Sequence, residues 1–222
     1  LDNLEFESPI SWNIEKDGNS CSYVVSRYFK DISNSRSPEW IQKKLLSIGL
    51  RPINSLVDIT NFITIDIGRP LHVFDADKIG SILHMRNAND GEKIYALDKK
   101  EYQLDSSITI IADKKNPLAI AGIIGGSETG CTDNTKNVFL EVALFDPSKV
   151  AKTGRKLGIN SDARYRFERG LDKEMIEEGL EYASYLINKI CGGSVSKNTS
   201  AGKLDKKKHV IDYNFNYFEK VI

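Results

Sequence analysis

The chain has 222 residues, which is enough for one large domain or two small ones. Lys and Arg total 31 and Asp and Glu total 31, so the formal net charge is zero. A protein that wraps a long stretch of nucleic acid needs a basic surface, so the composition argues against that class. It does not argue against contact with a single nucleotide or a strand end.

The three cysteines are widely spaced and indicate neither a metal site nor a redox motif. Cys21, Cys131 and Cys191 contain no CxxC pair, so neither a zinc site nor a disulfide framework is predicted. This cysteine usage favours a reducing cytoplasm as the compartment. The sequence also holds no signal peptide and no long apolar span, so no membrane partner is expected.

The first part of the chain is predicted to form one strand and then two helices. Residues 23–29 have the pattern of a strand. Ser37 and Pro38 suit the cap and the first turn of a helix that ends at Gly49. A second helix, over residues 55–67, is apolar on every side and is therefore expected to be buried.

Polar residues within and just after that second helix point to a pocket. Thr60 and Asn61 need hydrogen-bond partners if they lie inside the protein, and His72 follows closely behind Pro70. Buried polar groups that converge on a histidine are what a small-molecule pocket requires. A lone histidine is, however, more often a packed side chain than a catalyst, so both interpretations of His72 stay open from these residues.

From residue 82 onward the apolar pattern has a period of two, which predicts short strands. A glycine-rich run over residues 121–130 follows, then the apolar strand of residues 138–145. Asp146 and Asp172 each open a further helix. Segregated helices combined with mostly antiparallel strands predict an α+β fold.

Glu141 is the strongest anomaly because it interrupts the otherwise apolar strand VFLEVALF. Strand alternation puts Phe139, Glu141 and Phe145 on one face. A buried carboxylate is costly unless it has a partner. It is either bonded to backbone amides of the glycine-rich run, or it forms a pocket floor that accepts a hydrogen bond from a ligand hydroxyl.

The remaining motifs mainly argue against particular kinds of site. The glycines from Gly125 to Gly130 are spaced like half a phosphate loop, but Cys131 stands where that motif requires lysine, which argues against a nucleoside-triphosphate site. The charged run over residues 158–172 predicts a salt-bridged surface. The basic residues of 149–156 favour a solvated helix face over contact with a phosphate backbone. With no GxSxG elbow and no metal triad, a hydrolase of this sequence would use water as its nucleophile.

Five segments closely resemble the β subunit of bacterial phenylalanyl-tRNA synthetase, in the family's order and over most of residues 49–172. They are LRPINSLVDITNF, RPLHVFDADKI, PLAIAGIIGGSETG, NVFLEVALFDPSKVAKTGRKLGI and SDARYRFERGLD. The resemblance implies the central editing module of that subunit, an α+β fold with a barrel-like, mostly antiparallel core and packed helices. It implies hydrolysis of tyrosine wrongly esterified to phenylalanine tRNA. We therefore expect residues 1–202 to be this module of a longer polypeptide, and residues 203–222 a linker and the start of the next segment.

The resemblance also assigns roles to individual residues. Those that would recognise the tyrosine or line its pocket are Glu141, the backbone of Gly122, Ser161 and Ala163. Those that would hold the ester end, the terminal adenosine and the attacking water are His72, Thr60 and Asn61. The implied partners are the α subunit and the tRNA 3′ end. No metal or cofactor is expected in this fragment, and ATP and magnesium belong to other parts of the complex.

Three sites depart from the family pattern. Arg164 and Tyr165 stand where serine and histidine are usual, Arg69 replaces a common glutamine, and Val73 replaces a common alanine. Added bulk at these positions is expected to narrow or reshape the pocket. The alternative function is therefore a structural or tRNA-contacting scaffold of the same synthetase, without editing.

Overall fold

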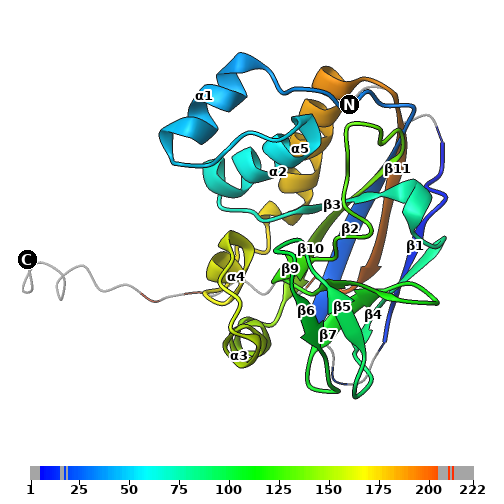
Figure 1. Ribbon diagram of the computed structural model, residues 1–222, viewed down its shortest axis with the longest axis vertical. Coiled ribbons are helices and arrows are strands. Elements are labelled where there is room, and N and C mark those ends of the chain that lie inside the picture. The colour runs from blue at the N-terminus through cyan, green and yellow to red at the C-terminus, as the bar shows by residue number, and fades with distance from the viewer. Residues whose placement is uncertain (1–5, 16–17, 19, 205–209, 211, 213–222) are drawn as a thin grey trace, which may run out of the picture.

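The computed structural model describes residues 6–15, 18, 20–204, 210 and 212. In this part of the chain a layer of helices covers one face of a sheet, and further strands cover its other face (Figure 1). The predicted α+β class is confirmed. The predicted linker and following segment fall mainly on residues 205–209, 211 and 213–222, which lie outside the described residues.

The central sheet of the described chain is antiparallel throughout. Its order is β11 (Ser194–Gly202), β2 (Cys21–Lys30), β10 (Val138–Phe145) and β3 (His72–Asp75). Strand β10 has neighbours on both edges, and every one of its residues is buried. A strand covered on both faces needs apolar side chains on both, which explains the nearly continuous apolar run of its sequence.

A second sheet packs on the central one. Its order is β1 (Ser11–Ile14), β4 (Ile82–Asn87), β7 (Thr109–Ala112), β8 (Pro117–Ile120) and β9 (Ile124–Gly125). The β1–β4 pair is parallel and the others are antiparallel, while β5 (Lys93–Tyr95) and β6 (Glu101–Gln103) form a separate pair. Over the described residues the sheets do not close into a barrel, so the core is mostly antiparallel, as expected, but open.

The helices fall into two groups. The first, α1 (Glu39–Ser47), α2 (Ser55–Asp66) and α5 (Met175–Cys191), lies together on one face of the central sheet (Figure 1). The second, α3 (Pro147–Leu157) and α4 (Asp162–Phe167), directly follows β10. A single 3₁₀ turn, η1 (Ala76–Lys78), follows β3 in the described chain.

Helix α2 matches the predicted helix to within one residue and has a clear start. The Asn54 side chain accepts a hydrogen bond from the Val57 amide, which satisfies one of the free donors of the first turn. The prediction that this helix is buried on every side is wrong at Ile65, which is 37% exposed. The helix is therefore packed on most of its surface and open to solvent on the remainder.

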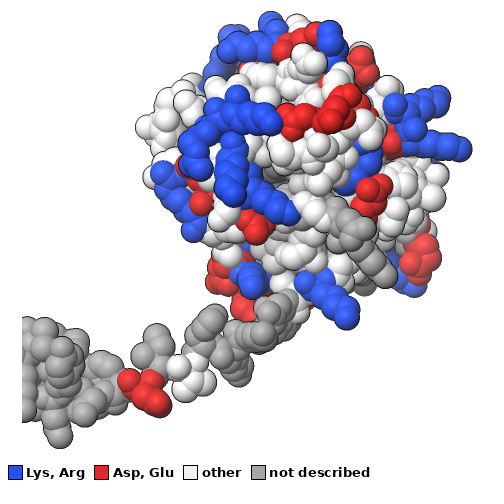
Figure 2. Space-filling view, turned by 90° about the horizontal axis from the view of Figure 1, so that it is seen from below, with Lys and Arg blue, Asp and Glu red and all other residues white. Residues whose placement is uncertain are grey.

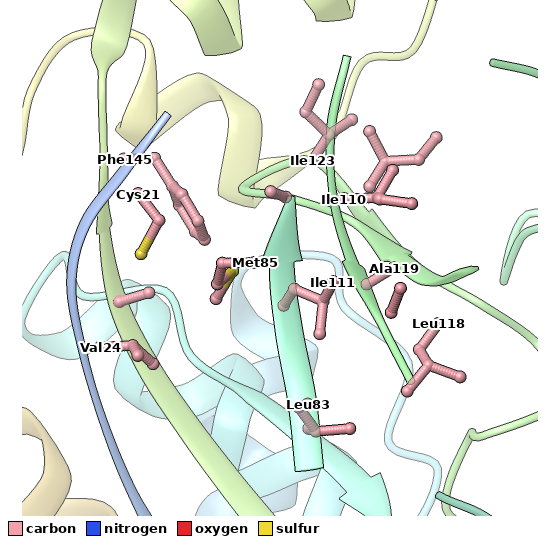
Figure 3. Packing of buried hydrophobic residues seen from close by; sticks show 14 of the residues in the cluster. Cys21, Val24, Leu83, Met85, Ile110, Ile111, Leu118, Ala119, Ile123 and Phe145 are labelled. Atoms are coloured by element: carbon pink, nitrogen blue, oxygen red, sulfur yellow. The ribbon is translucent and has the colours of Figure 1, made fainter. Parts of the chain in front are cut away.

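Two hydrophobic cores flank the central sheet. On the helix side, Val138, Leu140, Val142 and Leu144 of β10 pack in one cluster. On the other side, Phe139, Ala143 and Phe145 belong to a cluster that fills the space between the two sheets, where Phe145 and Cys21 face Met85 and Ile111 across the gap (Figure 3). The alternation predicted for β10 is thereby confirmed, and Glu141 lies on the inter-sheet face.

Candidate functional site

A cavity of about 290 Å³ lies between β10, the strands β7–β9 and helix α4. Its lining is mostly apolar and includes Leu71, Ile111, Ile120, Ile123, Phe145 and Phe167. Six of the seven predicted site residues also line it: Asn61, His72, Gly122, Glu141, Ser161 and Ala163. The size is close to the lower end of small-molecule pockets, which hold roughly 300–1,000 Å³.

Glu141 and His72 are direct neighbours in the central sheet. They are opposite each other in the antiparallel register of β10 and β3, so their side chains share a face. On the other edge of β10, Glu141 is opposite Ser26 of β2. The imidazole also packs edge-on against Phe74, with ring centroids 4.4 Å apart. One sheet row thus carries both polar groups into the cavity.

The carboxyl group of Glu141 is buried without a partner. Glu141 is 5% exposed. Its side chain makes no hydrogen bond to any other residue that the structure describes. A bond to the glycine-rich loop, one of the two interpretations left open above, is therefore not formed among these residues. Burial raises the pKa of Glu141 to about 8, so at neutral pH the group is mainly a neutral carboxylic acid rather than an anion.

His72 is half-buried as a residue, but its Nε2 atom lies inside the protein and the imidazole is uncharged at neutral pH. Its Nε2 atom has no hydrogen-bond partner within the described chain, and burial lowers the pKa of the imidazole to about 4. A neutral imidazole has one nitrogen that can accept a proton or a hydrogen bond from water. The cavity therefore holds an unused acceptor beside an unused carboxyl group.

Two glycines shape the cavity, and one of them was missed as a site residue. A Cβ on Gly125 would lie 2.5 Å from Cε1 of His72, so only a residue without a side chain leaves room for the imidazole. Gly122 has φ +69°, and a Cβ there would lie 2.9 Å from the Phe145 ring. The Gly122 amide makes no hydrogen bond to another described residue and is free for a ligand. The sequence signal for Gly125 was its place in the glycine-rich run, which by itself also fitted a tight turn.

The remaining predicted site residues divide into those that reach the cavity and one that does not. Ser161 lines it and caps α4, with its hydroxyl donating to the Ile123 carbonyl at 2.7 Å and accepting from the Arg164 amide. Thr60 is buried, but it does not line the cavity, and its hydroxyl donates to the Val57 carbonyl of the same helix at 2.9 Å. Its catalytic role stays a prediction.

The residues that depart from the family pattern do not narrow the cavity, because none of them lines it. Arg164 turns toward α3 and Glu168, and its Nε lies 3.0 Å from that carboxylate. Val73 packs in the core on the helix side of the sheet. Arg69 is buried and donates to the carbonyl of Asp172. The expected reshaping by bulk is therefore not seen.

Two negative findings apply to the described residues. None of the helices in the described part of the chain combines the length and the hydropathy that a transmembrane span needs. No group of three or more His, Cys, Asp or Glu side chains in that part of the chain is arranged to hold a metal ion.

The chain belongs to the B3/4 domain family, which matches residues 20–192. The chain is 51% identical over 209 residues to the phenylalanine–tRNA ligase β subunit of Nitrobacter winogradskyi, and 49% identical over 209 residues to that of Bradyrhizobium diazoefficiens. Each match covers 94% of this chain and 26% of the relative, so the chain spans about a quarter of their length.

A solved structure supports the fold. It is an N-terminal fragment of the phenylalanyl-tRNA synthetase β-subunit from Pyrococcus horikoshii, with a TM-score of 0.57 and 18% identity. The match covers 100% of this chain and 62% of that one. The family resemblance expected from the sequence motifs is confirmed.

Proposed function

We propose that this chain is the part of a phenylalanine–tRNA ligase β subunit that hydrolyses tyrosine wrongly esterified to phenylalanine tRNA. The observation that carries the proposal is the partnerless carboxyl group of Glu141, set in a largely apolar cavity opposite the free Nε2 of His72. High identity to phenylalanine–tRNA ligase β subunits supports the choice of substrate.

The cavity can discriminate tyrosine from phenylalanine in a way that a synthetic pocket for phenylalanine cannot. A hydrophobic pocket rejects an analogue that merely adds a hydroxyl by only about 10²-fold. This cavity favours the side chain with the hydroxyl. A phenol can hydrogen-bond with Glu141 and with the free Gly122 amide, whereas a phenyl ring leaves both unpaired. An unpaired buried polar group costs roughly 1–3 kcal/mol, which disfavours phenylalanine. The protonated carboxyl suits this role because it can both donate and accept.

Water is the proposed nucleophile. The Ser161 hydroxyl already makes two hydrogen bonds within the protein, so it is poorly placed to attack an ester. Nε2 of His72 is unengaged, and a neutral imidazole can hold a water molecule and take its proton as the ester is attacked. Asn61 also lines the cavity and can orient the ester end through its amide.

The wider assignments follow from the same proposal. The α subunit and the 3′ end of tRNA are the proposed partners, tyrosine is the released product, and the cytoplasm is the proposed compartment. ATP and magnesium would serve the synthetic reaction in parts of the ligase other than this chain.

The experiment is deacylation of tyrosine-charged phenylalanine tRNA by the ligase that carries this chain. We expect His72→Ala to slow hydrolysis by about 10²-fold or more, as loss of a general base does. Glu141→Ala should weaken discrimination between tyrosyl and phenylalanyl esters. Glu101→Ala, on the exposed edge of β6, is the matched control and should change neither. Hydrolysis at the full rate in both cavity variants would mean that the ester is cleaved elsewhere in the ligase, and this chain would then be a scaffold.

A further inference from the structure

We propose that the outer surface of α4, together with α3, binds an unpaired nucleobase near the 3′ end of the RNA, with Tyr165 as its stacking platform. The inference rests on the proposed function and names a contact that the cavity residues do not provide. Tyr165 lies on α4, outside the residues that line the cavity.

A second hollow lies beside the cavity that contains Glu141. It measures about 390 Å³ and is lined by Asn160, Ser161, Asp162, Arg164, Tyr165 and Glu168. Ser161 and Asp162 also line the cavity that contains Glu141, so the two hollows adjoin. An RNA strand whose esterified end enters the cavity must leave across neighbouring surface, and this hollow lies directly beside it.

Tyr165 is an exposed aromatic residue with an arginine against its ring. The residue is 57% exposed, although it is a large aromatic side chain. The Arg169 guanidinium lies 3.7 Å from the ring centroid, and its Nη1 donates to the Tyr165 carbonyl and to Glu168. These contacts hold the ring and the cation together while much of the tyrosine stays open. Exposed aromatic rings beside arginines are what single-stranded RNA uses for stacking.

The segment that includes α3 and α4 is locally basic. From Pro147 to Lys173 there are eight Lys and Arg residues and three Asp and Glu residues, a net charge of +5 in a chain whose total is zero. Exposed Lys152 and Arg155 of α3 form no ion pair with another described residue. Figure 2 shows a cluster of Lys and Arg side chains, with Asp and Glu side chains among them, on the face seen from below.

The helices that carry this surface are fixed to each other and to the cavity. A Cβ on Gly154 of α3 would fall within 2.3 Å of the Arg164 side chain, so Arg164 lies directly over α3. Val150 of α3 packs within 3.2 Å of where a Gly122 Cβ would be. A strand bound on the outer surface therefore keeps a defined position relative to the cavity. Neutral composition excludes a long nucleic-acid track, but this patch fits the few nucleotides of a strand end.

The test is equilibrium binding of a labelled RNA hairpin with an unpaired 3′ tail, compared with the same hairpin ending blunt. We expect Tyr165→Ala in the 222-residue chain to weaken binding of the tailed RNA by about 5- to 150-fold, the effect of losing one stacked base. Tyr165→Phe should retain most of the affinity, and the blunt hairpin should be nearly unaffected.

The chain supplies a matched control in Tyr185, which is 48% exposed and has Lys189 at 5.2 Å, but which lies on α5. Tyr185→Ala should leave affinity unchanged. Lys152→Gln and Arg155→Gln should each lower the slope of log affinity against log salt by about 0.7, the single-strand value for one phosphate contact.

Free tyrosine separates this inference from the proposed function. Calorimetric titration should show tyrosine binding to Tyr165→Ala as to the parent chain, and loss of binding in Glu141→Ala. Equal affinity of the parent and Tyr165→Ala for tailed RNA, or no binding of that RNA at all, overturns the platform and leaves the cavity assignment standing. RNA binding that depends on Tyr165, without any tyrosine binding, overturns the cavity assignment instead.

Discussion

The two faces of strand β10 differ although both are buried. The helix face is aliphatic and closely packed, with Val138, Leu140, Val142 and Leu144 in one core. The inter-sheet face carries Glu141 between aromatic residues and opens onto a cavity. One strand thus serves stability on one side and recognition on the other. Burial alone does not distinguish these roles, whereas the presence of partners for polar groups does.

Buried charge elsewhere in the central sheet sharpens the contrast. Arg27 of β2 is 1% exposed, and both its Nη atoms donate to Glu181 of α5, at 2.9 and 2.6 Å. That pair ties the sheet to the helix layer. Glu141 has no such partner, and its pKa is raised instead. Perturbed groups without partners, set in a cavity, are the ones that point to ligand chemistry.

The largest effect is expected from the packed face. Leu140→Ala should lower the free energy of unfolding by about 2–5 kcal/mol, because it leaves a cavity in a fully buried core. Urea denaturation measures the loss. Tyrosine binding at a temperature where the variant is folded should stay near that of the parent chain. A variant that keeps its stability but loses tyrosine binding would contradict the separation of the two faces.

The next effect concerns the fit of His72 against β9. In Gly125→Ala the new Cβ must displace the imidazole, whose Cε1 and Nε2 would lie 2.5 and 2.9 Å away. A shift of about 1 Å in a catalytic group can cost on the order of 10²-fold in rate, and we expect a loss of that size in ester hydrolysis. Single-turnover deacylation measures it.

Gly130→Ala is the control for that change, since its new Cβ would lie 3.3 Å from the Ser127 carbonyl oxygen and 3.4 Å from Leu97, an apolar residue of the cavity wall, and would not approach His72. It should hydrolyse within a few-fold of the parent. If both alanine variants hydrolyse at the parent rate, the imidazole is not held where the chemistry needs it.

A smaller effect is expected in the pH dependence of stability. The pKa of Glu141 is raised to about 8, so its contribution to stability is complete below the unfolded value of 4.5 and is lost as the pH rises through 8. The lowered pKa of His72, about 4 against 6.5, has the opposite sign and acts between those two values. Between pH 6.5 and 8 the slope therefore comes from Glu141 and not from His72.

In that window the free energy of unfolding should fall by about 1–2 kcal/mol in the parent chain, given 1.36 kcal/mol per pH unit for one proton. Glu141→Gln, which cannot ionise, should show a flatter profile. Urea titrations at pH 6.5, 7.2 and 8 compare the two. Parallel profiles would mean that the carboxyl is already ionised in the folded chain.

The sequence predicts the helices and strands of this site better than the contacts between them. Helix 55–67, the alternation of β10 and the salt-bridged arginines of α4 follow from local periodicity and charge spacing, and all three are found. The opposition of Glu141 and His72 could not be derived locally, because it depends on the register of strands that are some seventy residues apart. The approach of Gly125 to His72 is likewise a tertiary contact. The protonated state of Glu141 could not be derived locally either, because it depends on how completely the folded protein buries the carboxyl group.

The smallest effect is expected at Thr60, where the family-based role and the geometry give different expectations. Its hydroxyl proton is engaged by the Val57 carbonyl, and the residue does not line the cavity, although the adjacent Asn61 does. Thr60→Val keeps the shape and removes the hydroxyl. If the geometry governs, deacylation should change by less than about threefold, at least tenfold less than the loss in His72→Ala. A loss as large as that of His72→Ala would show that the hydroxyl turns toward bound substrate. The cavity would then extend along α2 when the ester is present.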